Sequence, residues 1–245
     1  MIKIDYETAN YFPGDKNKNE LAKPKSGNYY RYTVRASYDG KDSSGKDYLI
    51  YSGFDTEGLF LKYVATPKLI SISNATGGLQ IKWTAVAGAG KDPVKYNVYR
   101  RGAGSTSWSY LGSTTGTTWT DGGVKNANGG YYRYTVRAID GWYSAFDANG
   151  LFLKRLANPT LTGVVSSKSG ITVKWGAIKG TTGYYVYRKT ASSGWTRVGV
   201  VNGTNNTTYL DKTAKKGVTY TYTVRAVSGS TTSYFNSGIS CKDKY

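Results

Sequence analysis

The phrase Tyr-x-Tyr-Thr-Val-Arg-Ala occurs three times in this chain, at residues 30–36, 132–138 and 220–226. Its tyrosines, valine and alanine alternate with threonine and arginine, so the apolar side chains share one face and the polar side chains share the other. This period of two is typical of a β-strand with one buried face. The chain is therefore a repeat protein, and its function has to be interpreted through its repeats.

Other landmarks recur with this strand and show that the repeating unit is larger than one strand. Trp83 and Trp175 lie 92 residues apart. The phrase Gly-Leu-Phe-Leu-Lys occurs at 58–62 and again at 150–154. A repeat of about ninety residues is the size of a small domain. The sequence therefore predicts one partial or degenerate unit followed by two complete ones, with boundaries at 1–64, 65–156 and 157–245.

The last unit shows its strands most clearly. Short alternating segments, separated by turn residues such as Asn202-Gly203, favour β-strands over helices throughout. Seven strands in about ninety residues predict two packed sheets. They are expected at Thr160–Val165, Ile171–Trp175, Tyr184–Lys189, Thr196–Val201, Thr207–Asp211, Tyr220–Ala226 and Ser233–Lys242. The middle unit keeps this order and has four extra residues near 90–93.

The two complete units resemble fibronectin type III domains, in the form found as tandem repeats in large surface proteins of Gram-positive gut bacteria. The resemblance covers about 66–245. The matching residues are Trp83 and Trp175, the segments 96–100 and 184–188, and the segments 118–121 and 208–211 with Tyr132 and Tyr220. It implies an all-β fold of tandem immunoglobulin-like (fibronectin type III) β-sandwiches. It also implies that Tyr132 and Tyr220 are corner tyrosines, whose hydroxyls bond to backbone just upstream.

The first unit departs from this pattern, because only 29 residues precede Tyr30. The two last strands of a domain are present, and the earlier ones have no room. Either the sequence begins inside a unit, or a degenerate half-domain packs its apolar face on the next unit. In both cases Tyr30, Tyr32 and Val34 need a cover, because a bare two-stranded hairpin is marginal in water.

The composition argues against enzymatic and metal chemistry. The chain has no histidine, so Ser–His–Asp catalysis and histidine metal sites are excluded. The single cysteine, Cys241, is expected to be a small buried hydrophobe, since it stands where the other copies have leucine. Asp39, Asp42 and Asp47 lie close together, but intervening lysines favour a solvated hairpin tip over a calcium loop. We therefore expect no catalytic residue, no cofactor and no metal.

Two aspartates recur at equivalent positions, Asp121 and Asp211. Recurrence at the end of a predicted strand indicates a turn, where an aspartate accepts hydrogen bonds from nearby backbone. Trp108 and Trp195 also recur, and we expect both to belong to the framework.

The net charge of +18 is unevenly distributed. Residues 1–64 are almost neutral, residues 65–156 carry 11 basic against 4 acidic side chains, and residues 157–245 carry 12 against 2. Such a surface favours anionic partners through long-range attraction that salt weakens. The basic residues are scattered singly, without a helix or a basic run, so no specific nucleic-acid partner is expected. No apolar run is long enough for membrane insertion.

The best candidates for binding lie on one sheet face, where the outward side chains of neighbouring strands combine tyrosine and arginine, and in a hairpin turn of the middle unit. Outward-facing Thr135 and Thr223 are expected on the same face. Tyrosine and arginine are enriched at protein interfaces, but Tyr–Arg stacking also stabilises a sheet by itself. Both interpretations of these side chains, as a binding surface and as a means of stabilising the sheet, remain open. The candidate partner-binding residues are Tyr99, Arg133, Arg137, Trp142, Tyr143, Tyr185, Tyr187 and Arg225.

Two function classes follow. In the first, the chain is a non-catalytic binding module of a bacterial cell-surface protein that engages a host protein or glycoprotein, such as immunoglobulin, a matrix protein or mucin. In the second, the units are structural spacers of a larger surface protein or surface enzyme and hold another domain away from the cell wall. Their basic charge would then serve only to lie against anionic wall polymer or capsule. Either function places the protein outside the cell, at the surface or cell wall, although the sequence shows no export or anchoring signal.

Overall fold

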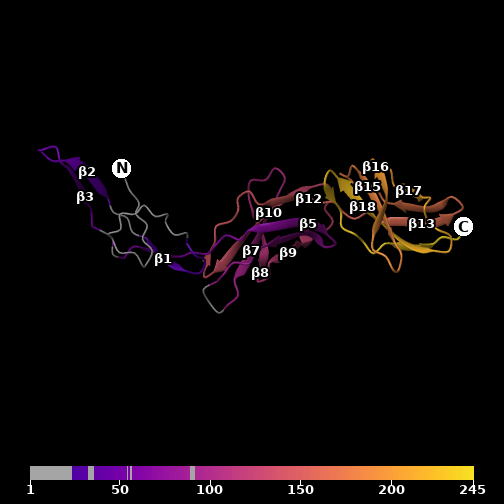
Figure 1. Ribbon diagram of the computed structural model, residues 1–245, viewed down its shortest axis with the longest axis horizontal. Coiled ribbons are helices and arrows are strands. Elements are labelled where there is room, and N and C mark those ends of the chain that lie inside the picture. The colour runs from indigo at the N-terminus through magenta and orange to yellow at the C-terminus, as the bar shows by residue number, and fades with distance from the viewer. Residues whose placement is uncertain (1–23, 33–35, 54, 56, 89–91) are drawn as a thin grey trace. The chain divides into compact units, whose positions relative to one another are not determined.

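The computed structural model describes residues 24–32, 36–53, 55, 57–88 and 92–245 (Figure 1). Within these ranges the regular structure is antiparallel β-sheet, with one short 3₁₀ turn at Gly122–Val124. The chain is therefore all-β, as predicted. The predictions for Val34 and for the extra residues 90 and 91 concern residues outside the described ranges. Among the described residues no helix is long and apolar enough to cross a membrane.

Internal contacts divide the chain into two compact units. One consists of Met1–Pro67, Ala85–Tyr96 and Arg137–Phe146, and the other of Lys68–Thr84, Asn97–Val136 and Asp147–Tyr245. The predicted domain boundaries remain predictions. We call strands β5–β12 the middle sandwich and strands β13–β20 the last sandwich.

The last sandwich has the two sheets expected of a fibronectin type III fold. One has the order β13-β14-β17, and the other has the order β16-β15-β18-β19 with β20 also on β18. The first six strands agree with the predicted ones to within two residues at each end. The bounds are β13 Leu161–Ser167, β14 Gly170–Trp175, β15 Gly183–Lys189, β16 Thr196–Asn202, β17 Thr208–Asp211, β18 Thr219–Ser228, β19 Thr231–Thr232 and β20 Ile239–Lys242.

The apolar faces of these strands meet in one core. Every second residue of β18 is buried, from Tyr220 to Ala226, together with Tyr184 of the neighbouring strand β15 and Trp175 of the other sheet. Cys241 is half-buried and packs against this core, opposite Tyr220 in the register, as Leu153 lies opposite Tyr132. The predicted position of Cys241 is confirmed, but the side chain is half-buried and not buried as expected.

The seventh predicted strand, Ser233–Lys242, is wrong in one respect. Only its end, β20, is a strand, because residues 233–238 leave the sheet. The short strand β19 comes just before the predicted range, and β19 and β20 pair with opposite ends of β18. Gly238 brings the chain back with a φ of 79°, and a Cβ there would collide with the carbonyl oxygen of Tyr222. Only glycine adopts that conformation at low cost. We call residues 233–238 the strap.

The middle sandwich repeats this topology, with the sheets β5-β6-β9 and β11-β10-β7-β8 and with β12 on β10. Its interruption in the last strand recurs as well, because β11 and β12 are separated by residues 144–150. The bounds are β5 Leu69–Ala75, β6 Gly78–Trp83, β7 Lys95–Gly102, β8 Ser109–Thr114, β9 Thr118–Asp121, β10 Tyr131–Asp140, β11 Trp142–Tyr143 and β12 Leu151–Lys154.

The first copy of the repeated strand is described at its start. Strand β1 (Tyr29–Tyr32) pairs with β4 (Leu59–Lys62), as expected for the last two strands of a domain. Tyr30 is buried, and its hydroxyl accepts a hydrogen bond from the backbone nitrogen of Lys25 at 2.7 Å. Tyr220 accepts the equivalent bond from Lys215 at 3.3 Å, so the corner tyrosine is confirmed there.

Between β1 and β4 the chain forms a separate hairpin of β2 (Ser37–Lys41) and β3 (Asp47–Tyr51). Asp42 closes its tip, since its Oδ1 accepts hydrogen bonds from the backbone nitrogens of Ser44 and Lys46 at 2.9 and 3.0 Å. Lys41 and Asp47 form an ion pair at 2.7 Å. The described residues include no group of side chains suited to a metal ion. The segment is the predicted hairpin tip.

Candidate binding surface

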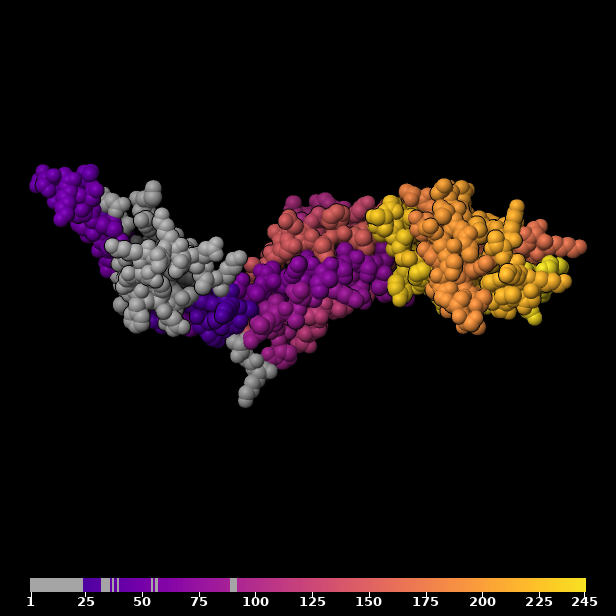
Figure 2. Space-filling view, in the orientation of Figure 1, coloured from indigo at the N-terminus to yellow at the C-terminus, as the bar shows by residue number. Residues whose placement is uncertain are grey.

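The predicted binding residues of the last sandwich lie on adjacent strands. Tyr185 stands opposite Arg225, and Tyr187 stands opposite Thr223, in the pairing of β15 with β18. All of these except Thr223 are partly exposed. The last sandwich is the orange and yellow part of Figure 2.

Two of these residues belong to a continuous aromatic–cation stack. The ring of Phe235, from the strap, lies under the Arg225 guanidinium at 4.5 Å and meets Tyr187 edge-on at 4.9 Å. Phe235 also stacks on Trp195 at 5.8 Å, with an interplanar angle of 15°. The Lys189 ammonium lies over the ring of Trp195, 4.9 Å from its centre. We call these five residues the Phe235 stack.

The arginine of the stack is held by more than the ring. Its Nε donates to the carbonyl oxygen of Ser233, and its Nη2 donates to the hydroxyl of Thr232. Tyr185 is not part of the stack, because its ring is covered instead by Arg197 at 4.6 Å. The structure thus joins Tyr187 and Arg225 through Phe235 and leaves Tyr185 beside them.

The corresponding residues of the middle sandwich make a similar cluster. Arg137 lies over Tyr143 at 4.9 Å and over Phe146 at 5.7 Å, and its Nε donates to the carbonyl oxygen of Ser144 at 2.8 Å. Trp142 and Tyr143 form β11 beyond the bend at Gly141, with 46% and 59% of their surfaces exposed. The hairpin-tip position predicted for this aromatic pair is confirmed.

The remaining two candidates lie elsewhere on the middle sandwich. Arg133 covers the ring of Phe152 on β12 at 4.8 Å and donates to the carbonyl oxygen of Asn149. Tyr99 packs against Tyr110 of β8, with the ring centroids 5.7 Å apart. Each arginine among the candidates therefore covers an aromatic ring.

Two residues expected to face outward are buried. Thr135 and Thr223 are 1% and 0% exposed, because the segments that leave the sheet cover them. Thr135 donates to the carbonyl oxygen of Asp147 at 2.8 Å, and Thr223 donates to the side-chain oxygen of Asn236. The exposed face is consequently narrower than predicted, and the strap forms part of it.

The sequence interpretation missed the rings that organise these clusters, Phe146 and Phe235. A signal was present, since Ser144-Ala-Phe146 and Ser233-Tyr-Phe235 recur 89 residues apart. Trp195, assigned to the framework, also belongs to the exposed stack. Alternation alone placed Phe235 in a regular strand, and the break in that strand is what turns its ring over Arg225.

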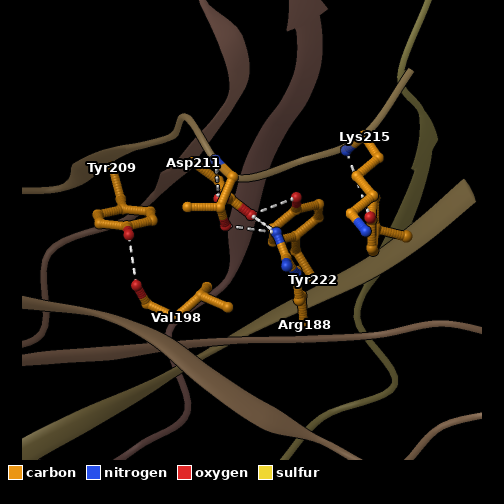
Figure 3. A network of polar contacts seen from close by, with 8 residues as sticks. Arg188, Val198, Tyr209, Asp211, Lys215 and Tyr222 are labelled. Carbon is orange, nitrogen blue, oxygen red and sulfur yellow. Dashed lines mark hydrogen bonds and ion pairs between the residues drawn. The ribbon is translucent and has the colours of Figure 1, made fainter. Parts of the chain in front are cut away.

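A second group missed from the sequence is buried behind the surface. Asp211 accepts hydrogen bonds from Arg188 at 2.6 Å and from the Tyr222 hydroxyl at 2.8 Å (Figure 3). Its other oxygen accepts from the backbone nitrogen of Thr213 at 2.9 Å, which confirms the predicted turn role. Nearby, the Tyr209 hydroxyl donates to the carbonyl oxygen of Val198 (Figure 3). We call Arg188, Asp211 and Tyr222 a clasp.

The same clasp occurs in the middle sandwich. Asp121 accepts from Arg100 at 2.8 Å and from the Tyr134 hydroxyl at 2.7 Å, and its Oδ1 accepts from the backbone nitrogen of Gly123 at 2.9 Å. The carboxylate is 4% exposed. Because all of the acceptor oxygens of the two carboxylates are engaged internally, the clasps tie the sheets together and offer no free group for chemistry.

Burial and hydrogen bonding set the protonation of the clasp in the last sandwich. Burial alone would raise the pKa of Asp211, but the hydrogen bonds from Thr213, Tyr222 and Arg188 outweigh it and lower that pKa below its usual value. Burial, and then the hydrogen bond to Asp211, raise the pKa of Tyr222 well above its usual range. The pair is thus a carboxylate and a neutral phenol at all ordinary pH values.

Comparisons with known proteins found matches among solved structures only. No family model matches the chain, and no curated protein matches it. Among solved structures, the FN1–FN3 domains of chicken CNTN1 are 16% identical over 89% of this chain and 78% of that chain, with a TM-score of 0.36. The chicken interferon gamma receptor alpha chain is 11% identical over 74% of this chain and 100% of that chain, with a TM-score of 0.39.

Proposed function

We propose that this chain is a non-catalytic binding module of a bacterial cell-surface protein, and that it engages a host protein or glycoprotein such as immunoglobulin, a matrix protein or mucin. The observation that supports this proposal is the Phe235 stack. Its five side chains are partly exposed on the sheet face and are already held in place by one another and by the strap.

Preordered aromatic and arginine side chains suit a binding surface for two reasons. Little side-chain entropy is lost when a partner covers them, because their rotamers are fixed before binding. Aromatic rings and arginine also supply most of the energy at many protein interfaces. The face is basic as well, since residues 157–245 hold only two acidic side chains, Asp211 and Asp243, and both are buried. Acidic host glycoproteins would be attracted to it.

Binding to purified immunoglobulin, a matrix glycoprotein and mucin, each immobilised separately, tests the proposal. Phe235→Ala and Arg225→Ala remove the centre of the stack, and we expect each to weaken binding by about 2 kcal/mol or more. Lys174→Ala is the matched control, because Lys174 is an exposed cation on β14, in the other sheet. Its effect should be small.

Two outcomes would overturn the proposal. In the first, none of the three probes is retained at about 0.15 M salt. In the second, Lys174→Ala weakens binding as much as Arg225→Ala does, which would indicate general charge attraction without a defined site. Circular dichroism of each variant establishes that the fold is intact.

The second function is a spacer whose basic charge lies against anionic wall polymer. A spacer needs a firm connection between consecutive units, and one observation on that connection favours this function. The segment that leaves β12 is tied down by Arg155, which is 3% exposed and donates to the carbonyl oxygens of Val124 and Lys125 at 3.1 and 2.8 Å. The next residue, Leu156, belongs to the core of the last sandwich. A spacer would retain no host probe and would be insensitive to both stack variants.

A further inference from the structure

A groove of about 580 Å³ opens on the surface of the middle sandwich, away from the Phe235 stack. It lies between the turn at residues 102–106 and the start of β10. The side chains that matter for recognition are Arg101, Tyr131, Arg133 and Phe152. This volume lies within the range of about 300–1,000 Å³ that small-molecule sites occupy.

The sequence builds this groove from a tight turn beside a strand. Strand β7 ends at Gly102, and the backbone nitrogen of Ala103 donates to the carbonyl oxygen of Tyr131 at 3.0 Å, which fixes the turn against β10. Gly104 has a φ of 78°, and a Cβ added there would have no neighbour within 4 Å, so the turn is open to solvent. Ser105 and Thr106 follow at the rim.

Two arginines lie in the groove, and both are oriented by aromatic rings. The Arg101 guanidinium lies 4.7 Å from the centre of Trp108, and the Arg133 guanidinium lies 4.8 Å from the centre of Phe152. Arg133 is fixed further by its hydrogen bond to the carbonyl oxygen of Asn149. No lining residue is acidic. The groove therefore has two positioned cations and no internal counter-charge.

Besides the two arginines, the walls of the groove carry two aromatic side chains. Phe152 and Tyr131 are 56% and 48% exposed, and one face of each ring lies under a cation, Arg133 at 4.8 Å and Lys154 at 5.7 Å, so a ligand would meet the remaining ring surface. Guanidinium groups bind planar carboxylates through pairs of parallel hydrogen bonds, and exposed rings favour ligands with an apolar face. The Ser105 hydroxyl is engaged with the backbone of Ser107, and the hydroxyl of Thr106 can bond to a ligand that carries hydroxyls of its own.

We propose that this groove binds a sugar ring that carries a carboxylate, with Arg101 and Arg133 on the carboxylate and Tyr131 and Phe152 against the ring. The chemistry fits a sialic acid at the end of a glycoprotein glycan or a uronic acid of a polysaccharide. The assignment of a host glycan as its source rests on the proposed function. The groove itself does not depend on the Phe235 stack.

The last sandwich supplies a natural comparison, because the same positions lack the groove's side chains. Arg133 pairs across the strands with Phe152, and the equivalent pair is Thr221 with Ser240, whose hydroxyls lie 2.8 Å apart. Thr219 stands where Tyr131 is, and Lys189 stands where Arg101 is. A single fold therefore accepts both sets of residues, so exchanging them is compatible with folding.

Titration of the whole chain with methyl glycosides, followed by calorimetry and by nuclear magnetic resonance, tests the proposal. The probes are the glycoside of N-acetylneuraminic acid, the glycoside of glucuronic acid, and the neutral galactoside as control. We expect both acidic glycosides to bind and the neutral one to bind at least about tenfold more weakly, since it leaves the arginines without a carboxylate. Whichever acidic glycoside binds more tightly identifies the source.

The variants are taken from the last sandwich. The double exchange Arg133→Thr with Phe152→Ser should weaken binding of the acidic glycosides by about tenfold or more. Arg101→Lys keeps the charge but loses the paired hydrogen bonds, so binding should fall less, by a few-fold. Arg197→Thr is the control, because Arg197 is a ring-covering arginine of the last sandwich, outside the groove.

The outcomes separate this proposal from the proposed function. If neither acidic glycoside binds, while glycoprotein binding survives sialidase treatment and still depends on Phe235, the groove proposal is wrong and the stack proposal holds. If the acidic glycosides bind and no glycoprotein is retained, the groove proposal holds and the proposed function fails. Tighter binding of a phosphorylated sugar than of either carboxylate would overturn the assignment to carboxylates.

Discussion

The middle and last sandwiches keep the same buried clasp behind two different surfaces. In both, a carboxylate at the end of a strand accepts hydrogen bonds from an arginine and a tyrosine of the opposite sheet, with distances that agree to within about 0.2 Å. On the surface, the cross-strand pair Arg133–Phe152 of one sandwich is Thr221–Ser240 in the other.

This comparison shows which residues of the repeat are constrained by the fold. A buried carboxylate cannot lose its partners without a large cost, so the clasp residues recur together. An exposed cross-strand pair contributes little to stability, so it can be exchanged for another without loss of the fold. The recurring buried clasp residues therefore specify the fold, and the exposed cross-strand pair is where the two sandwiches differ in what they can bind.

Breaking the clasp should produce the largest effect. We expect Asp211→Asn and Asp121→Asn each to lower the free energy of unfolding by about 3 kcal/mol, because each leaves a partly buried arginine without its carboxylate. Urea unfolding gives the total loss, and hydrogen exchange with peptide resolution assigns it to one sandwich. A loss below about 1 kcal/mol in either variant would show that the two clasps are not equivalent.

Removing one hydroxyl from the clasp should cost less. Tyr222→Phe and Tyr134→Phe each delete a hydrogen bond to a carboxylate, worth about 1.5–3 kcal/mol, and leave the ring packing unchanged. Thermal unfolding monitored by near-ultraviolet circular dichroism measures the shift. Because both phenols are buried, equal shifts are expected, and clearly unequal shifts would contradict the comparison.

The clasp of the last sandwich should also make the stability of the fold depend on pH in the acidic range. The pKa of Asp211 is lower in the folded chain than in the unfolded chain, so its contribution is fully present above the unfolded value near 3.8 and is lost as pH falls below it. The midpoint temperature of thermal unfolding should therefore decrease as the pH is lowered from about 4 to about 2. In Asp211→Asn that fall should be shallower; an unchanged slope would rule out Asp211 as its source.

Exchanging the surface pair should have the smallest effect on stability. Arg133→Thr with Phe152→Ser removes an exposed cation–aromatic contact, worth about 0.5–1 kcal/mol, and installs the pair already present in the last sandwich. The midpoint of thermal unfolding should move by only a few degrees. A loss as large as that of the clasp variants would mean that this pair also specifies the fold.

Local pattern was enough to predict most of the strands. Alternation and turn glycines placed the first six strands of the last sandwich to within two residues, because both signals act between neighbours in the sequence. The interruption of its last strand was not predicted, since it depends on the contact of Gly238 with the backbone of Tyr222. The buried face of Thr223 and the position of Phe235 both follow from that interruption.

The candidate site was predicted in part for the same reason. The period of two put Arg225 and Tyr187 on one face, and their neighbouring strands brought them together as expected. What joins them is Phe235, which reaches that face only because its segment leaves the sheet. The clasp was missed because its three members come from three strands, and only the aspartate was recognised as a recurring feature.

The strap has a consequence for how such chains behave when crowded together. In residues 157–245, which are all described, β18 has β15 on one side. On its other side, at the edge of the sheet, are two short strands, β19 of two residues and β20 of four. A short, interrupted border offers few consecutive unpaired amide and carbonyl groups to a neighbouring molecule. The same break that turns Phe235 toward Arg225 therefore also hinders edge-to-edge aggregation, which matters for any protein built from many copies of one sheet.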